Sequence, residues 1–531
     1  MAETTTGGVT PKQSPYVFGI DLGTSNSGIA VFIDGRATLF QIEEGNKGCA
    51  SVMSVRDNGD ILVGREARRR LMIDPENTVA SVKREMGTRW TKEFTGLPGE
   101  VYTPTDVSAE ILGRLINGAL QAGTPDIKGT PHKAVICIPA NFDDAKKEAT
   151  KEAGELAGLE VEWLLEEPVA AAIAYAFERD RDQTILVYDL GGGTFDVSVL
   201  KVDSSAGGTA GLRILAKEGV PRLGGDDFDL EIMKVAAARF QATSGLDVLD
   251  EKKDQGISVK SLREAQQKLK DAAETAKWEL TESQSAQITI PNFIKSEDGN
   301  VHNLDCEIKR GEFNDAVRPL LLQSKEAVER ALDSAKLKLE DISRIILVGG
   351  STRVPLVKEM LVEMFKREPY ADENVDTVVA RGAAIWGATL LAPQLPPEGR
   401  HTGSISITNI VTHFLGIETY GGGFAPILEK GLEIPEDKPL SATKTFANPR
   451  DNMAEMAVRI YQSDLPATSV RDEGVKCIGE FFCKGIPPRP AGKVQIEVTF
   501  GIDQQNVLKV EAVGPGLSGE KESRQLEIKR S

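Results

Sequence analysis

Two short stretches of the sequence place an aspartate at the head of a glycine-rich turn. The first, DLGTSNSG, begins at Asp21, and the second, DLGGGTFD, begins at Asp189; each follows an apolar run. Glycine has no Cβ, so backbone N–H groups in such turns can approach phosphate oxygens closely. An aspartate can hold a hydrated magnesium ion, which usually takes one or two carboxylates. A single copy is more often an ordinary turn, but two copies predict a clamp on the β- and γ-phosphates of a nucleotide.

Two further glycine-rich stretches occur later in the chain. LGGDD spans 223–227, and LVGGSTR spans 347–353, directly before an amphipathic helical pattern at 354–365. The backbone of the second stretch can approach a nucleoside, while the N-terminus of the helix favours negatively charged phosphates. Each of these two stretches is a weak signal by itself, so their interpretation depends on the two aspartate turns.

These turns are set among alternating strand and helix patterns. Four apolar runs are nearly continuous, as expected for strands that are buried on both faces, and they span 16–21, 133–139, 184–190 and 344–350. The segments 143–158 and 354–366 have apolar residues at helical spacing, and Asp143 can cap the first of them. The pattern predicts an α/β architecture for residues 16 to about 395.

The character of the sequence changes after Ala392. A stretch rich in Pro, Gly and Ser reads as a linker, and beyond it apolar and polar residues alternate with a period of two, for example at 494–500. This alternation predicts an all-β domain, with a sandwich as the expected form. The predicted organisation is a disordered leader (1–15), an α/β domain (16–395), a linker (396–412) and a β domain (413–531).

Composition excludes several classes of function. Of the 531 residues 40% are hydrophobic, and the net charge of −17 argues against both a nucleic-acid-binding surface and a polybasic membrane contact. No apolar stretch reaches the ~18 residues of a membrane helix, and the N-terminus has no signal-peptide pattern. Five scattered cysteines without a CxxC pair read as thiols in a reducing compartment. We therefore expect a cytoplasmic protein.

Aspartate-headed turns also occur in actins and sugar kinases, so other residues must decide the family. The chain resembles the heat shock protein 70 (DnaK-type) molecular chaperones over residues 16–531, through GIDLGTSNS, SVKREMG, IPANFDDAKKEATKEAGELAGL, EEPVAAAIAYA, VYDLGGGTFDVSVL, RLGGDDFD, ILVGGSTRVPLV, VARGAAIWGA, LGIETYGG and KVQIEVTFGID. The resemblance implies a two-lobed, actin-like (ribonuclease H-like) ATPase domain and a β-sandwich that binds extended, unfolded peptide. ATP, ADP and Mg²⁺ are the cofactors that it implies.

The resemblance also implies roles for single residues. Lys83 would reach the γ-phosphate, Glu167 would contact magnesium-bound water, and Asp21 and Asp189 would hold the metal through water. Thr24 and Thr194 would present hydroxyls to the phosphate and the attacking water. The alternatives are an exposed helix lysine for Lys83 and a surface carboxylate for Glu167. The catalytic set is Lys83, Glu167, Asp189 and Thr194.

The nucleotide-binding residues that the resemblance implies lie in the four turns and in one helix. The helix at 274–281 carries three of them on one face, and Trp278 stands where family members often have a stacking arginine. Adenine would lie between Trp278 and Arg353. The full set is Asp21, Gly23, Thr24, Ser25, Asn26, Gly191, Gly192, Gly193, Gly224, Gly225, Glu274, Lys277, Trp278, Thr281, Gly349, Gly350, Ser351, Arg353 and Asp376.

A peptide groove is implied for the β domain. It would be lined by Ile417, Tyr420, Phe446, Met456 and Val458, and it would bind an extended peptide through main-chain hydrogen bonds and an apolar pocket. The alternative is that these side chains simply form the core of the sandwich. For Phe446 and Met456 the two readings have equal weight.

The sequence departs from the family pattern at sites that couple the domains. The linker 405–409 lacks the acidic residue of the family and ends in Asn409. The patch 161–166 carries glutamates where family members present basic residues to a J-domain co-chaperone. In the family's Pro-Ala-Tyr-Phe motif, Asn141 replaces the tyrosine. The sequence ends at Ser531, so the expectation is a divergent member that lacks the helical lid of the family. We therefore keep two hypotheses, an ATP-dependent chaperone and a nucleotide-gated scaffold with slow hydrolysis. A dedicated J-domain protein and a nucleotide exchange factor are the possible partners.

Overall fold

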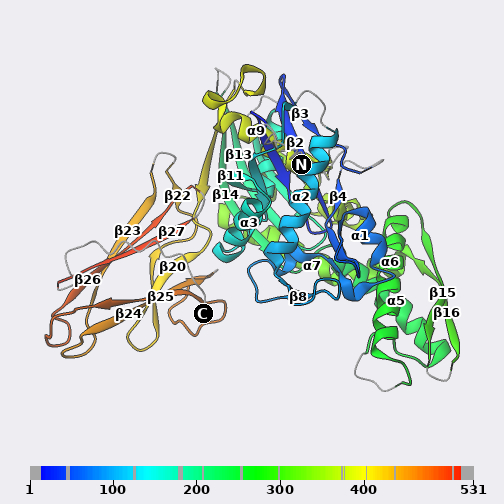
Figure 1. The fold of residues 1–531 in the computed structure, drawn as a ribbon. Coiled ribbons are helices and arrows are strands. Elements are labelled where there is room, and N and C mark those ends of the chain that lie inside the picture. The colour runs from blue at the N-terminus through cyan, green and yellow to red at the C-terminus, as the bar shows by residue number, and fades with distance from the viewer. Residues whose placement is uncertain are drawn as a thin grey trace, which may run out of the picture. The chain divides into compact units, whose positions relative to one another are not determined.

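The computed structural model describes residues 13–43, 48–122, 127–177, 183–205, 209–250, 255–296, 299–371, 375, 377–401, 403–435, 438–463, 465–504 and 507–515. The chain forms two compact units, which we describe separately: Met1–Val199 with Glu218–Ser404, and Leu200–Lys217 with Ile405–Ser531. The expectation of a mixed α/β region is confirmed, with several sheets (Figure 1). Among the described residues, no helix is long and apolar enough to cross a bilayer.

The N-terminal half of the first unit is built on one sheet. Its strand order is β11 (Glu160–Glu166), β10 (Lys133–Ile138), β1 (Val17–Asp21), β2 (Asn26–Ile33) and β3 (Arg36–Leu39), and β4 (Cys49–Ala50) also pairs with β2. β1 runs parallel to β10 and antiparallel to β2, so the turn at 22–25 is the loop of a hairpin. The helices α2 (Pro104–Ala122), α3 (Asp144–Leu156) and α9 (Val378–Leu390) pack on this region, and Asp143 caps α3 as predicted.

The C-terminal half repeats this arrangement. Here β12 (Gln183–Leu190) lies between β17 (Arg344–Val348) and β13 (Phe195–Ser205), and β18 (Tyr370–Ala371) is the neighbour of β17. The parallel partners β12 and β17 are almost fully buried, which explains their continuous apolar sequences. The helices of this half are α4 (Glu167–Phe177), α5 (Gly225–Ser244), α6 (Val259–Glu282), α7 (Arg310–Ala335) and α8 (Pro355–Phe365).

Smaller elements complete the first unit. A three-stranded sheet is formed by β5 (Val52–Val55), β6 (Ile61–Val63) and β7 (Thr78–Ala80) beside α1 (Arg65–Arg70). Two hairpins are formed by β8 (Lys92–Glu93) with β9 (Val101–Tyr102) and by β15 (Ser285–Lys295) with β16 (Val301–Lys309). The 3-10 helices are η1 (Pro75–Asn77), η2 (Val82–Glu85), η4 (Leu339–Asp341), η5 (Gly350–Arg353), η6 (Ala392–Gln394) and η7 (Pro397–Gly399).

The second unit consists mainly of two β-sheets. One contains β21 (Gly423–Leu428), β20 (Phe414–Thr419), β24 (Glu455–Ser463) and β25 (Lys476–Lys484), and the other contains β23 (Leu440–Ala447), β26 (Gln495–Ile502) and β27 (Leu508–Val513). Alternate residues of both sheets share one apolar core, as the period-two pattern predicted. The unit also includes β19 (Ser404–Ile410), β22 (Glu433–Ile434) and most of β14 (Thr209–Val220).

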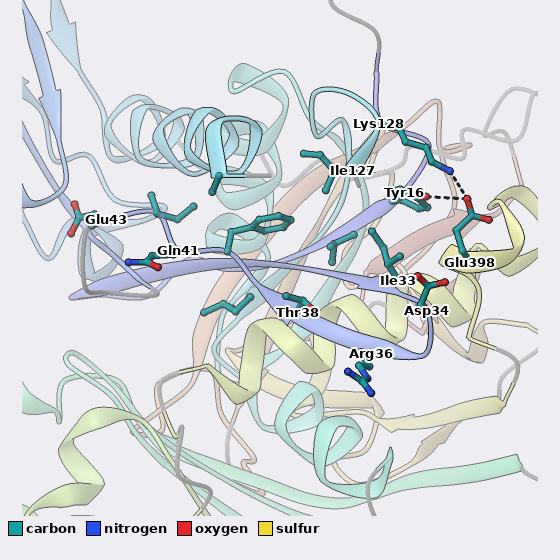
Figure 2. A pocket seen from close by; sticks show the side chains of 15 residues that line it. Tyr16, Ile33, Asp34, Arg36, Thr38, Gln41, Glu43, Ile127, Lys128 and Glu398 are labelled. Atoms are coloured by element: carbon teal, nitrogen blue, oxygen red, sulfur yellow. Dashed lines mark hydrogen bonds and ion pairs between the residues drawn. The ribbon is translucent and has the colours of Figure 1, made fainter. Parts of the chain in front are cut away.

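A cavity of about 1160 Å³ lies along the edge strand β3 of the first unit. Figure 2 shows that Glu43 lies toward one end, while Tyr16, Lys128 and Glu398 gather at the other. There the Tyr16 hydroxyl donates a hydrogen bond to Glu398, and Lys128 forms an ion pair with the same carboxylate. The cavity contains none of the glycine-rich turns, so it is not the nucleotide site that the sequence predicts.

Candidate functional site

Three of the four glycine-rich turns meet at the end of β12. The amides of Gly225 and Asp226 donate hydrogen bonds to the carbonyls of Gly191 and Gly192, at 3.0 and 2.8 Å. Ser351 Oγ donates to the Gly191 carbonyl at 2.8 Å. A Cβ on Gly224 would lie 2.6 Å from the backbone of Gly192, so only glycine permits this approach.

The turn after β1 joins this cluster. A Cβ on Gly192 would lie 2.1 Å from Ser25 Oγ, and a Cβ on Gly193 would lie 2.9 Å from Thr24 Oγ1. Gly349 has a φ of 83°, and a Cβ there would lie 2.9 Å from the Asp189 carboxylate. The two aspartate turns are therefore brought together, and the turn at 347–353 reaches the same place.

Lys83 and Glu167 form an ion pair in the interior of the same unit. Lys83 lies in η2 and Glu167 begins α4, and both side chains are buried. Burial by itself lowers the pKa of Lys83, but the carboxylates of Glu167, Asp21 and Asp189 raise it above its ordinary value. Lys83 is therefore a buried cation, and the alternatives of an exposed lysine and a surface glutamate are excluded.

Asp189 and Asp196 add further carboxylates. Both are buried, and burial together with Glu167, Asp196 and Asp21 raises the pKa of Asp189. For Asp196, burial and then the charge of Glu167 raise the pKa to about 8. Asp196 is the last residue of DLGGGTFD, and no role was predicted for it. A second aspartate within the same motif was the signal that could have identified it.

Four carboxylates near one buried lysine leave an excess of negative charge. Such a donor set fits a divalent cation, because burial and the neighbouring carboxylates raise the pKa of Asp189 and a cation would favour its charged form. Among the described residues, no three acidic, histidine or cysteine side chains converge as direct metal ligands. Asp21 and Asp189 stay the predicted residues for a magnesium ion that keeps its own waters.

The predicted adenine-binding residues on α6 have different environments. Lys277 donates hydrogen bonds to Asp229, at 2.9 Å, and to the Gly225 carbonyl, at 3.0 Å, so it lies beside the glycine turns. Glu274 forms an ion pair with Arg68 of α1. Trp278 is 67% exposed, and Thr281 donates a hydrogen bond to its carbonyl.

The remaining predicted nucleotide-binding residues lie on or near the four turns. Arg353 is exposed at the end of η5, and Thr194 directly precedes β13. Asp376 lies outside the described residues. Stacking of adenine between Trp278 and Arg353 stays a prediction.

The residues predicted for the peptide groove separate into two groups. Ile417 and Val458 are buried in the apolar core of the second unit, and Phe446 and Met456 are partly buried against it. Tyr420 is 71% exposed after β20, with the guanidinium of Arg450 over its ring at 5.6 Å. Only Tyr420 is presented fully to solvent.

The departures from the family pattern also have defined environments. In the second unit, Lys217 Nζ donates a hydrogen bond to Asn409 Oδ1 at 2.6 Å, and both residues are buried. In the first unit, Glu162 forms an ion pair with Lys133 at 2.8 Å, and Glu166 is buried. The two glutamates of the patch are therefore not free surface charges.

Comparison with known proteins agrees with the geometry. The family model for "Hsp70 protein" matches residues 17–96 and 94–531. The chain is 39% identical over 514 residues to "Chaperone protein DnaK" of Thermotoga petrophila, which covers 96% of this chain and 80% of that protein. It is 37% identical over 515 residues to the protein of the same name from Halobacterium salinarum, with 97% and 75% covered.

The family match spans nearly the whole chain, both the α/β region and the β-sheets of the second unit. ATP-dependent chaperone activity, with ATP and Mg²⁺ as cofactors, is the function of this family, and that expectation is confirmed. The comparisons give no support to the scaffold hypothesis. The chain belongs to the Hsp70 family.

Proposed function

We propose that this chain hydrolyses ATP at the meeting point of the glycine-rich turns and uses the cycle to control binding of extended peptide by its second unit. The observation that carries the proposal is the buried Lys83–Glu167 pair beside the aspartates and backbone amides of these turns. A fixed cation and preorganised N–H donors stabilise charge that develops on a transferring phosphoryl group.

Each residue has a distinct task in the proposed reaction, in which ATP and water give ADP and phosphate. The backbone amides of the turns hold the phosphate oxygens, and Lys83 lies against the γ-phosphate. Glu167 fixes the position of the Lys83 ammonium, and Thr194 orients the attacking water. A bound magnesium ion would neutralise charge on the phosphates, with Asp21 and Asp189 holding its waters.

The proposal also covers the domain organisation, the compartment and the partners of the chain. The first unit would be an actin-like, two-lobed domain, with boundaries at 16–395, and the domain at 413–531 would be the peptide-binding sandwich. The five cysteines, which form no disulfide among the described residues, support a reducing compartment such as the cytoplasm. A dedicated J-domain protein and an exchange factor are the proposed partners.

The test is ATP hydrolysis measured with and without an unfolded peptide. We expect magnesium-dependent hydrolysis that the peptide stimulates, because peptide binding to the second unit is coupled to hydrolysis in the first in the proposed cycle. A chain that binds ATP but hydrolyses it at the same rate with and without peptide would contradict the coupling. Peptide binding that is unchanged by ATP would contradict it as well.

A further inference from the structure

Arg84, the neighbour of Lys83, connects the two halves of the first unit. Its Nη2 donates a hydrogen bond to Asp227 Oδ2 at 2.6 Å, and its Nε lies 3.7 Å from Asp226 Oδ2. These side chains are only 15–22% exposed, so water screens the pairs little. Arg84 lies in η2 and the two aspartates in the first turn of α5, so the contact joins segments more than 140 residues apart.

The two aspartates are themselves held by groups around the glycine turns. The amide of Gly224 donates a hydrogen bond to Asp227 Oδ2 at 2.8 Å, and Ser81 Oγ donates to Asp226 Oδ2 at the same distance. One oxygen of Asp227 thus contacts both Arg84 and the turn at 223–225. A displacement of the arginine would move this turn.

Arg84 also contacts the second aspartate turn. Its Nη2 lies 3.4 Å from the Gly192 carbonyl, and its Nε lies 2.7 Å from the position that a Cβ on Gly193 would occupy. That Nε is buried and has no hydrogen-bond partner among the described atoms. The guanidinium therefore fills the space between the DLGGG turn and the turn at 223–225.

Lys83 and Arg84 point to different partners from the same short helix. Lys83 pairs with Glu167 at the start of α4, and Arg84 pairs with Asp227 at the start of α5. The helix η2 is thereby fixed from two directions. The position of the Lys83 ammonium depends on both contacts.

We propose that Arg84 is a positioning residue, which locks Lys83 and the two phosphate-binding turns into one arrangement and slows the release of nucleotide. The inference rests on the proposed ATP hydrolysis at this site. Arg84 acts through Asp227 and the turns rather than on the phosphates.

The test compares Arg84→Met with Asp227→Asn. Asparagine keeps an oxygen that can accept from the Gly224 amide but removes the charge that pairs with Arg84. We expect both variants to release a fluorescent ADP analogue about tenfold faster and to slow single-turnover hydrolysis by a similar factor, since a partly buried ion pair is lost. Arg84→Lys keeps the positive charge but loses the planar, two-pronged guanidinium. Its rates of release and hydrolysis should lie between those of the unmodified chain and those of Arg84→Met.

Two controls separate this role from general destabilisation. Arg239→Met removes an arginine that pairs with Glu312 on the β16–α7 side of the unit, and it should leave release and hydrolysis unchanged. The double variant Arg84→Met/Asp227→Asn should be no worse than either single variant, because both remove the same interaction. If Arg84→Met does not fold, Asp227→Asn and Arg84→Lys carry the test.

Release and hydrolysis within twofold of the unmodified chain in Arg84→Met would overturn the proposal. The proposal would also be overturned if the rate changes of the two single variants multiplied in the double variant, since Arg84 would then act independently of Asp227. If the unmodified chain itself fails to hydrolyse ATP, the proposed function is contradicted instead. Measuring the unmodified chain beside the variants therefore distinguishes the two failures.

Discussion

The two units differ in how closely their predicted site residues are brought together. In the first unit, turns from four places in the sequence converge around buried charges, with Lys83 paired to Glu167. In the second unit, Val458 is buried in the apolar core, whereas Tyr420 is exposed. A phosphate site needs backbone amides and fixed charges, which a short motif specifies locally. A peptide groove needs apolar side chains at the boundary of a core, and a residue type alone cannot show on which side of that boundary it lies.

The largest effect is expected where the charge is most buried. Lys83→Ala should leave ATP binding nearly intact and slow single-turnover hydrolysis about a hundredfold, because losing a charge aimed at the transition state costs on the order of 3 kcal/mol. The proposed nucleotide contacts of the glycine turns would not depend on this side chain. Hydrolysis at the unmodified rate would remove Lys83 from the catalytic set. The site residues of the first unit would then be no better predicted than those of the second.

Much of the first site was accessible from sequence because its signals are local. The aspartate turns, the strands before them and the glycines that permit close approach all lie within a few residues of one another. The partners were not accessible, since the contacts of Glu274 with Arg68 and of Lys277 with Asp229 join segments 206 and 48 residues apart. Asp196 was missed although it stands in the second aspartate motif, because its burial beside Glu167 becomes visible only in the folded chain.

In the second unit, the period-two pattern predicted the strands and their apolar faces correctly. It could not separate core from groove, because both require an apolar side chain on the inner face of a strand. Ile417 and Val458 show the outcome, since both belong to the core cluster. The strand that would contain Leu526 and Ile528 lies outside the described residues.

The second prediction tests whether core and groove are distinct. Val458→Ala should lower the free energy of unfolding of the second unit by about 2 kcal/mol, because it leaves a cavity in a well-packed core. Tyr420→Ala should change that free energy by less than about 0.5 kcal/mol and should weaken peptide binding instead. Denaturant unfolding and peptide titration measure the two effects. Unchanged stability in Val458→Ala, with peptide binding lost, would place Val458 in the groove.

The third prediction concerns the exposed edge of the nucleotide site. If Trp278 stacks on adenine, Trp278→Ala should weaken ATP binding by roughly 1–2 kcal/mol, since a base stacked on an indole loses its main apolar contact. The intrinsic fluorescence of the unmodified chain should change on addition of ATP, and this change should disappear in the variant. Unchanged ATP affinity in Trp278→Ala would mean that adenine recognition depends on other residues of the site.

The smallest effect is expected from the contact of Arg450 with Tyr420. A guanidinium over an exposed ring contributes about 0.5–1 kcal/mol, mainly by restricting the ring to one orientation. Arg450→Gln should therefore weaken binding of an extended peptide about two- to fivefold, less than Tyr420→Ala, and the double variant should resemble Tyr420→Ala alone. Peptide titrations on the four proteins measure the coupling between the two side chains.

Arg459→Gln, which removes an exposed arginine paired with Glu418 and Glu480, is the matched control for charge. Equal weakening in both arginine variants would attribute the effect to net charge, and the exposed tyrosine would then bind peptide without support from its neighbour.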